Sequence, residues 1–247
     1  FVARAGLGAS ESMRSKLAEY NDPRLSRAFI TKQGTSGKEQ APGTADNAVY
    51  APNGTPEQGT SKYGTSLFMY SISAPTLLLS YHELKFLEAE ALCRLERDAK
   101  SALKDAVVAG LLNAENSFTI SRKELGKTLI NAASSITEAE AESYFDNTIE
   151  AKYTAEPLKT TMTQKYFALW GASGEATESY NDVRRMKGLG ENFIELKNPN
   201  SFPLRCPYGN SDTTTNAEVK AAYGNGQYVY SENVWWAGGS KIGRAHV

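Results

Sequence analysis

Apolar residues after residue 80 recur with the period of an amphipathic helix. Two adjacent faces carry them: Leu84, Leu87, Ala91 and Leu95 on one, and Phe86, Ala89 and Cys93 on the other. Because residues three and four apart share a helical face, this pattern predicts a helix that is packed on two sides. A second helix is predicted over residues 101–112.

Three local signals predict where further helices begin. Ser121 followed by Glu124, and Thr137 followed by Glu140, fit the capping box, in which a hydroxyl and a carboxylate satisfy free backbone N–H groups. Pro157 suits a first helical turn, where its missing N–H costs nothing. We therefore expect helices over 122–132 and 138–150, another from residue 157, and a last one through 185–186.

The remaining stretches predict the end of a helix at the N-terminus and long loops elsewhere. Residues 1–20 have loosely helical apolar spacing, and residues 21–24 form a turn signal with Asp-Pro. Residues 31–66 are rich in Gly, Pro, Ser, Thr and Asn, and a loop of that length is usually functional or disordered. Further loops follow residue 188. The predicted fold class is mainly α.

Composition excludes several functions. The chain has 247 residues, 40% of them hydrophobic, which suffices for one sizeable core or two small ones. Its formal net charge of -1, with no basic run, argues against nucleic-acid binding. The longest apolar stretch, over residues 74–79, is too short to cross a bilayer. The two cysteines fit no metal-binding spacing, and Cys93 is expected to be a buried free thiol.

The residues that carry chemistry in other proteins do not form a catalytic or metal-binding pattern here. Phe86 stands one turn after His82, where a zinc-binding motif needs a second histidine, so we expect no metal and assign His82 a hydrogen-bonding role on or between helices. Carboxylates such as Glu88 and Glu90 are interpreted as solvated faces, and no nucleophile elbow is present. Arg184 and Arg185 form either an anion clamp or, as we favour, the end of a helix.

Short segments in a fixed order carry a resemblance to a known family. They are Asn21-Asp22-Pro23-Arg24-Leu25; Ala74-Pro75 leading into residues 80–91; Gln164-Lys165-Tyr166; Val183-Arg184-Arg185; Phe202-Pro203-Leu204-Arg205 with Pro207-Tyr208 and Asn216; and Val234-Trp235-Trp236. Together they resemble the C-terminal part of the SusD/RagB family, in its SusD-like branch. Cys206 and Gly209 depart from the family pattern in one loop.

The resemblance implies an α-helical scaffold of tetratricopeptide-like helix pairs with long ligand-bearing loops. It also implies a non-catalytic, cofactor-free protein that binds oligosaccharides on the extracellular face of the outer membrane in a Bacteroidota-like bacterium. Such a protein delivers its ligand to a partner SusC-like TonB-dependent transporter and contacts the membrane only through a lipid anchor that this sequence lacks. A peptide-binding member of the family and a tetratricopeptide-like adaptor for proteins are the alternatives.

Aromatic side chains among polar ones indicate where a glycan would bind. Sugar rings pack on flat aromatic faces, while Asn and Asp hydrogen-bond the hydroxyl groups. In the long polar loop, Tyr50 and Tyr63 stand near Asp46, Asn47 and Asn53, and these five are the predicted ligand-binding residues.

The sequence is expected to hold one SusD-like domain, over residues 1–240. The last seven residues, KIGRAHV, reverse-translate to the start of a common sequencing adapter. We expect residues 241–247 to be an artefact of gene assembly.

Overall fold

The computed structural model describes residues 8–33, 38–40, 50–54, 63–125, 129–130, 134–197, 201–224, 228–234 and 237–239. The chain divides into two units, residues 1–197 and 198–247. Trp235, Trp236 and residues 241–247 lie outside the described residues.

Helices dominate the first unit, as predicted. In chain order they are α1 (Glu11–Glu19), a 3-10 turn (Leu67–Tyr70), α2 (Tyr81–Arg94), α3 (Lys100–Leu125), α4 (Glu138–Tyr144), a π-helical segment (Phe145–Ile149), α5 (Glu150–Ala155), α6 (Pro157–Leu169) and α7 (Glu178–Gly188). The second unit contains α8 (Asn210–Thr215) and α9 (Ala217–Tyr223). None of the described helices is long and apolar enough to span a membrane.

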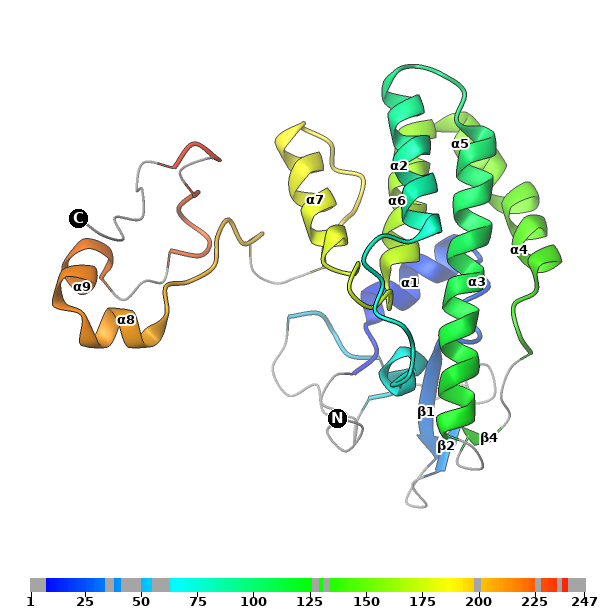
Figure 1. Ribbon diagram of the computed structural model, residues 1–247, viewed down its shortest axis with the longest axis horizontal. Helices are drawn as coiled ribbons and strands as arrows, with labels where there is room; N and C mark the ends of the chain where they lie inside the picture. Colours follow the sequence, from blue (N-terminus) through cyan, green and yellow to red (C-terminus); the bar gives the residue numbers. More distant parts are fainter. Residues whose placement is uncertain are drawn as a thin grey trace. The chain divides into compact units, whose positions relative to one another are not determined.

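The core of the first unit lies where α2, α3 and α6 pack together, with α2 and α3 forming a helical hairpin (Figure 1). Phe86, Phe118 and Phe167 are fully buried there, one from each helix. At Gly110 of α3 the two backbones come so close that an added Cβ would lie 2.9 Å from the Cβ of Ala168 on α6. A larger residue at this position would push α3 away from α6.

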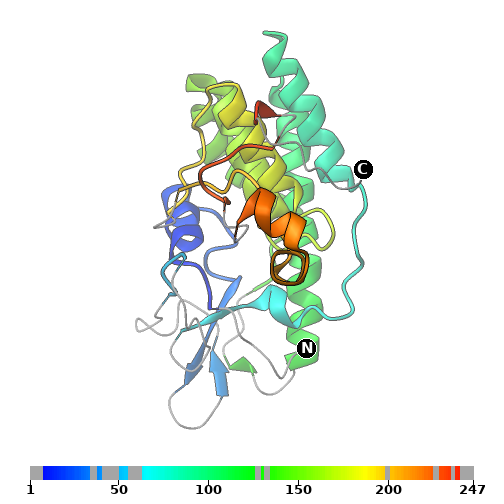
Figure 2. The same ribbon diagram turned by 90° about the vertical axis from the view of Figure 1, so that its left-hand side faces the viewer.

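A small sheet lies at one end of these helices (Figures 1 and 2). Its strands are β1 (Phe29–Gln33), β2 (Lys38–Gln40), β3 (Thr65–Ser66) and β4 (Leu129–Ile130), in the order β3-β1-β2-β4. β1 is antiparallel to β2 and β3, and β2 is parallel to β4. The prediction of one long loop over residues 31–66 is therefore only partly right, because the described part of this stretch includes strand residues.

The turn at residues 21–24 holds a buried ion pair. The Asp22 carboxylate accepts from the Arg24 backbone N–H (2.9 Å) and from Nε and Nη2 of its guanidinium (2.8 and 2.6 Å). Arg24 Nη1 donates to the Phe167 carbonyl oxygen at 2.7 Å, and the Tyr144 hydroxyl lies 3.4 Å from Asp22 Oδ2. Both charged side chains are at most 2% exposed, so this pair ties the turn to α4 and α6.

The chain from α4 to α5 is one continuous helix interrupted by the π-helical turn. Thr137 caps its start by accepting from the Glu140 N–H, as predicted, but the Glu140 carboxylate pairs with Arg27 at 2.9 Å, so only the Thr137 half of the capping box is confirmed. The π turn buries Phe145 and Ile149. Further on, the Tyr153 hydroxyl accepts from the Ala99 N–H at 2.8 Å, which attaches α5 to the start of α3.

The other predicted capping box, at Ser121 and Glu124, is not present. Ser121 lies inside α3 and is fully buried, and its hydroxyl interacts with the carbonyl oxygens of Leu67 (2.6 Å) and Ser117 (2.9 Å). A serine hydroxyl that bonds the carbonyl one turn earlier does not interrupt a helix. The predicted helices over 101–112 and 122–132 are thus replaced by the single α3, which ends at Leu125.

The prediction that α2 packs on two sides is also wrong within this structure. Phe86 and Ala89 are buried, but Leu84, Leu87 and Leu95 are 51%, 42% and 66% exposed. The apolar row that predicted the first buried face therefore points away from the core.

Candidate functional site

The predicted ligand loop is only partly described. Asp46 and Asn47 lie outside the described residues, and Tyr63 is half-buried. Tyr50 is half-buried, with its ring edge-on to Phe29 at 5.3 Å between centroids. The Arg14 guanidinium lies 5.4 Å from the centre of the Tyr50 ring.

The same loop is attached to the start of α1 at residues 50–54. The Ser10 hydroxyl donates to Asn53 Oδ1 at 2.9 Å, and the Ala51 and Glu11 N–H groups complete a backbone bridge (2.8 and 3.0 Å). Burial raises the pKa of Tyr50, so its hydroxyl stays protonated. These contacts fix Tyr50 and Asn53 in place, while a ligand role for the five loop residues stays a prediction.

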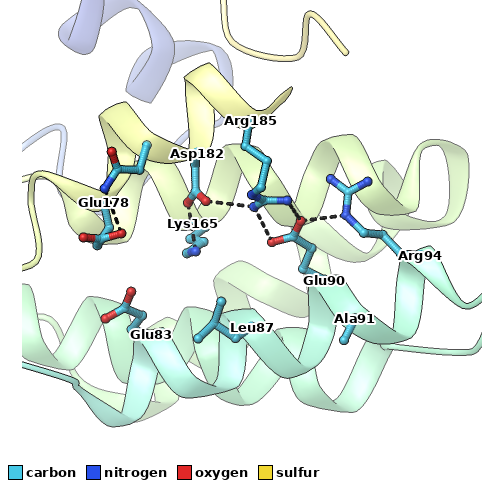
Figure 3. A pocket seen from close by; sticks show the side chains of 10 residues that line it. Glu83, Leu87, Glu90, Ala91, Arg94, Lys165, Glu178, Asp182 and Arg185 are labelled. Atoms are coloured by element: carbon cyan, nitrogen blue, oxygen red, sulfur yellow. Dashed lines mark hydrogen bonds and ion pairs between the residues drawn. The ribbon is translucent and has the colours of Figure 1, made fainter. Parts of the chain in front are cut away.

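A second candidate site, which the sequence did not reveal, is a groove of about 520 Å³ between α2 and α7 (Figure 3). Glu83, Leu87, Glu90, Ala91 and Arg94 of α2 line one wall. Glu178, Asn181, Asp182 and Arg185 of α7 line the other, and Lys165 comes from α6.

Contacts at the N-terminal ends of α2 and α7 fix the two helices that form the walls of the groove. Ser80 caps α2 by accepting from the Glu83 N–H at 3.1 Å. Gly174, with a positive φ of 92°, lets the turn before α7 approach the Leu77 carbonyl, where any side chain would clash. The Ser80 N–H donates to the Glu175 carboxylate of this same turn. The entry to α2 and the entry to α7 are thus fastened to each other.

At one end of the groove a chain of ion pairs bridges the two walls. Lys165 Nζ lies 2.8 Å from Asp182 Oδ2, and Arg185 Nη2 lies 2.8 Å from both Asp182 Oδ1 and Glu90 Oε2. Arg94 Nε donates to Glu90 Oε1 at 2.7 Å. Burial disfavours the charged form of Glu90, but the two arginines outweigh it and hold its pKa below the ordinary value. This end is electrically balanced.

The sequence interpretation of these charged residues needs correction. Glu90 is buried, at 5% exposure, and is not part of a solvated face, whereas Glu88 is exposed as expected. Arg185 lies in the last turn of α7, as favoured, but its guanidinium contacts Glu90 and Asp182. The sequence pattern did not reveal the groove, because the residues that line it come from three segments that are far apart in the chain.

The other end of the groove is acidic. Burial, a hydrogen bond with Glu175 and the nearby Glu178 raise the pKa of Glu83 to about 7. Among the described residues no lysine or arginine forms an ion pair with Glu83 or Glu178. Figure 3 shows these two side chains on opposite walls.

His82 is buried beneath this acidic end. Its Nε2 lies 3.5 Å from Glu175 Oε2, and burial lowers its pKa despite that carboxylate. Neither of these two atoms has a hydrogen-bond partner among the described residues, so the predicted hydrogen-bonding role is not confirmed, and His82 is not on the surface. In the part of the chain that the structure describes, no cluster of His, Cys, Asp or Glu is arranged to hold a metal ion.

Cys93 is a free thiol and is only half-buried. Its sulfur lies 3.6 Å from the Thr161 hydroxyl. Burial raises the pKa of the thiol, which therefore stays protonated and unreactive. Neither this thiol nor the groove places a nucleophile beside a general base.

Helix hairpins, extended loops and a polar groove define a helical binding scaffold. The chain belongs to the SusD-like family whose model is described as "Starch-binding associating with outer membrane", which matches residues 2–208. A crystal structure of a SusD/RagB family protein from Bacteroides thetaiotaomicron VPI-5482 is 64% identical and superposes with a TM-score of 0.87. The match covers 97% of this chain and 52% of that one.

The chain thus spans about half the length of that relative. A search of the curated proteins gives no match. Proteins of the SusD/RagB family are non-catalytic binding proteins, and the mainly helical fold predicted from sequence is confirmed.

Proposed function

We propose that the chain is part of a protein that binds oligosaccharides at the outer membrane, without catalysis, and delivers them to a TonB-dependent transporter. The observation that carries this proposal is the family match over residues 2–208, with its starch-binding, outer-membrane description. The 64% identity to a SusD/RagB protein supports it, since that level preserves fold and much of the surface.

The proposed ligand residues are Tyr50, Tyr63, Asp46, Asn47 and Asn53. Tyrosine rings stack on the C–H faces of sugars, and the carboxylate and amides orient hydroxyl groups. The contacts of Tyr50 with Phe29 and Arg14 support this role, because a ring that is already fixed loses little entropy on binding.

The full-length protein is proposed to lie on the extracellular face of the outer membrane, held there by a lipid anchor. Its partner would be a SusC-like transporter that receives the bound glycan. Capture and transfer need no covalent chemistry.

The test is calorimetric titration of maltooligosaccharides and other glycans into the protein and into Tyr63→Ala. We expect saturable binding to one glycan class and about tenfold weaker binding by the variant, since one stacked ring contributes about 0.5–1.5 kcal/mol in addition to its buried area. Tyr81→Ala serves as the control, because Tyr81 is 60% exposed on α2.

Tyr50→Phe adds a second arm. It keeps the ring that packs on Phe29 but removes the hydroxyl, so it separates stacking from hydrogen bonding without a cavity. Binding of peptides and of no glycan would keep the family and change the ligand class. Unchanged affinity in Tyr63→Ala would move the site away from this loop.

A further inference from the structure

Three ionisable side chains are buried together where the chain enters α2 and α7. His82 and Glu175 are each 2% exposed, and Glu83 is 7% exposed. His82 Nε2 lies 3.5 Å from Glu175 Oε2, and neither atom has a hydrogen-bond partner among the described residues. The Glu83 side chain makes a hydrogen bond with that of Glu175. Residues of this chain alone bury the three groups, so their burial does not depend on any further part of the protein.

Glu175 connects the two helix entries to each other. Its carboxylate accepts from the Ser80 N–H, at the N-cap of α2. Beside it, the Leu77 N–H donates to the Ser173 carbonyl oxygen at 2.6 Å. We call these two hydrogen bonds, together with the contact between the Glu83 and Glu175 carboxyl groups, the entry latch.

Lys165 of α6 faces the carboxyl pair but does not neutralise it. Its Nζ lies 2.8 Å from Asp182 Oδ2, so its charge is shared with a carboxylate of α7. Glu178, also on α7, adds another negative charge near Glu83. With the attraction of Lys165 included, burial and the contact with Glu175 still raise the pKa of Glu83 to about 7. Two carboxylates in contact and away from water cannot both ionise without a large cost.

His82 supplies little positive charge near neutral pH. Burial lowers the pKa of its imidazole, and the nearby Arg24 lowers it further, although Glu175 opposes both. The imidazole therefore loses its proton at a lower pH than Glu83 does. Above the ordinary pKa of histidine, the group of this cluster that titrates is Glu83.

The other end of α7 is held by contacts that do not titrate in this range. Arg185 Nη2 lies 2.8 Å from Glu90 Oε2 and from Asp182 Oδ1. The pKa of Glu90 is held below its ordinary value, and arginine stays charged at any pH near neutral. α7 is thus attached at its start by a contact that depends on a proton and near its end by one that does not.

We propose that the entry latch is a proton-dependent switch, which is closed while Glu83 carries a proton that it donates to Glu175 and opens when Glu83 is ionised. Opening lets the N-terminal end of α7 move away from α2, while the end at Arg185 stays attached. The groove between α2 and α7 then widens at its acidic end. This switch rests on the buried cluster alone and is independent of glycan binding.

The raised pKa of Glu83 sets the size of the effect. In the open latch Glu83 meets water and its pKa returns towards the ordinary value of 4.5, whereas in the closed latch it is about 7. The closed form therefore binds more protons, so its stabilisation is complete below pH 4.5 and is lost as pH rises through 7. Linkage between these two values makes the opening equilibrium constant about tenfold larger at pH 8 than at pH 6.

The test is amide hydrogen exchange of the complete chain, followed by NMR at pH 6 and pH 8 and corrected for the intrinsic pH dependence of exchange. Protection factors of the Leu77 and Ser80 N–H groups should fall about tenfold at pH 8, because these two groups exchange when the latch opens. Protection should not change for the Ala99 N–H, before α3, or for the Leu189 N–H, which donates to the Arg185 carbonyl oxygen.

Two matched variants on α2 test the cause. Glu83→Gln keeps a side-chain N–H that can donate to Glu175 but does not titrate, so the latch amides should have equal protection at the two pH values. Glu88→Gln removes an exposed carboxylate of the same helix and should keep the tenfold change of the wild type.

Three results would each overturn the proposal. The first is equal protection of the Leu77 and Ser80 amides at pH 6 and pH 8 in the wild-type chain, which needs no variant. The second is a fall in protection that persists in Glu83→Gln. The third is an equal fall at Ala99, which would mean that the whole unit, and not the latch, loses stability as pH rises.

Discussion

The buried pair of Asp22 and Arg24 gives a sharp stability prediction. Replacing Asp22 by Asn removes the negative charge that faces the guanidinium and weakens the carboxylate's four hydrogen bonds. Arg24 then keeps only the Phe167 carbonyl as a strong acceptor, while its side chain is 2% exposed. Losing one partner of a buried pair costs about 3–5 kcal/mol, because the remaining charge is stranded away from water.

Urea denaturation followed by circular dichroism measures this loss. With an m-value of about 2 kcal/mol/M, a loss of about 4 kcal/mol lowers the midpoint by about 2 M. The matched control is Asp146→Asn. Asp146 pairs with Lys104 at 2.6 Å, but its side chain is 49% exposed, so the control should cost less than about 1 kcal/mol.

A double variant tests the cause. Arg24→Met in the Asp22→Asn background removes the stranded charge, and it should recover most of the lost stability. If Asp22→Asn costs no more than Asp146→Asn, or if Arg24→Met adds a further large loss, the stranded charge is not what stabilises this turn.

Two further predictions concern a glycine and the acidic end of the groove. Gly171→Ala should lower the free energy of unfolding by about 2–4 kcal/mol, because the φ of Gly171 is 79° and a Cβ there would overlap the Phe68 ring. Gly190→Ala is the control and should cost about 1 kcal/mol, because Gly190 has a similar φ of 76° but open space around it. Equal melting temperatures of the two variants would contradict this prediction. Because the pKa of Glu83 is raised in the fold to about 7, its contribution to stability is present below its unfolded pKa and is lost as pH rises through about 7. Glu83→Gln should therefore be more stable than wild type at pH 8, by at most about 3 kcal/mol, and similar to wild type at pH 4. Glu88→Gln on the exposed face is the control and should differ little from wild type at either pH. Thermal melts at both pH values test this, and a Glu83→Gln variant that is less stable than wild type at pH 8 would contradict it.

Local patterns predicted the helices well, since caps and periodicity act within a few residues. Thr137 and Pro157 both start helices as expected. Ser121 failed because the same hydroxyl that caps a helix start also bonds a carbonyl within a helix, and only the surrounding packing decides between the two.

Which face of a helix is buried depends on partners far along the chain. The pattern on α2 gave two apolar faces, but only the one with Phe86 meets α3 and α6. The groove was hidden for the same reason. Glu90 looks like a surface carboxylate until Arg185, 95 residues later, is placed beside it.

The π turn over Phe145–Ile149 has a consequence for insertions and deletions. A π turn holds about one residue more than the α turn that would replace it, so removing one residue there would let the helix close into ordinary α geometry with the following residues nearly in register. Tyr153 would then keep the Ala99 N–H that it accepts from. A residue added or removed in the regular α-helical parts would instead rotate everything after it by about 100°. Homologous sequences should therefore vary in length at the π turn and keep the length of the rest of the stretch between Thr137 and Tyr153.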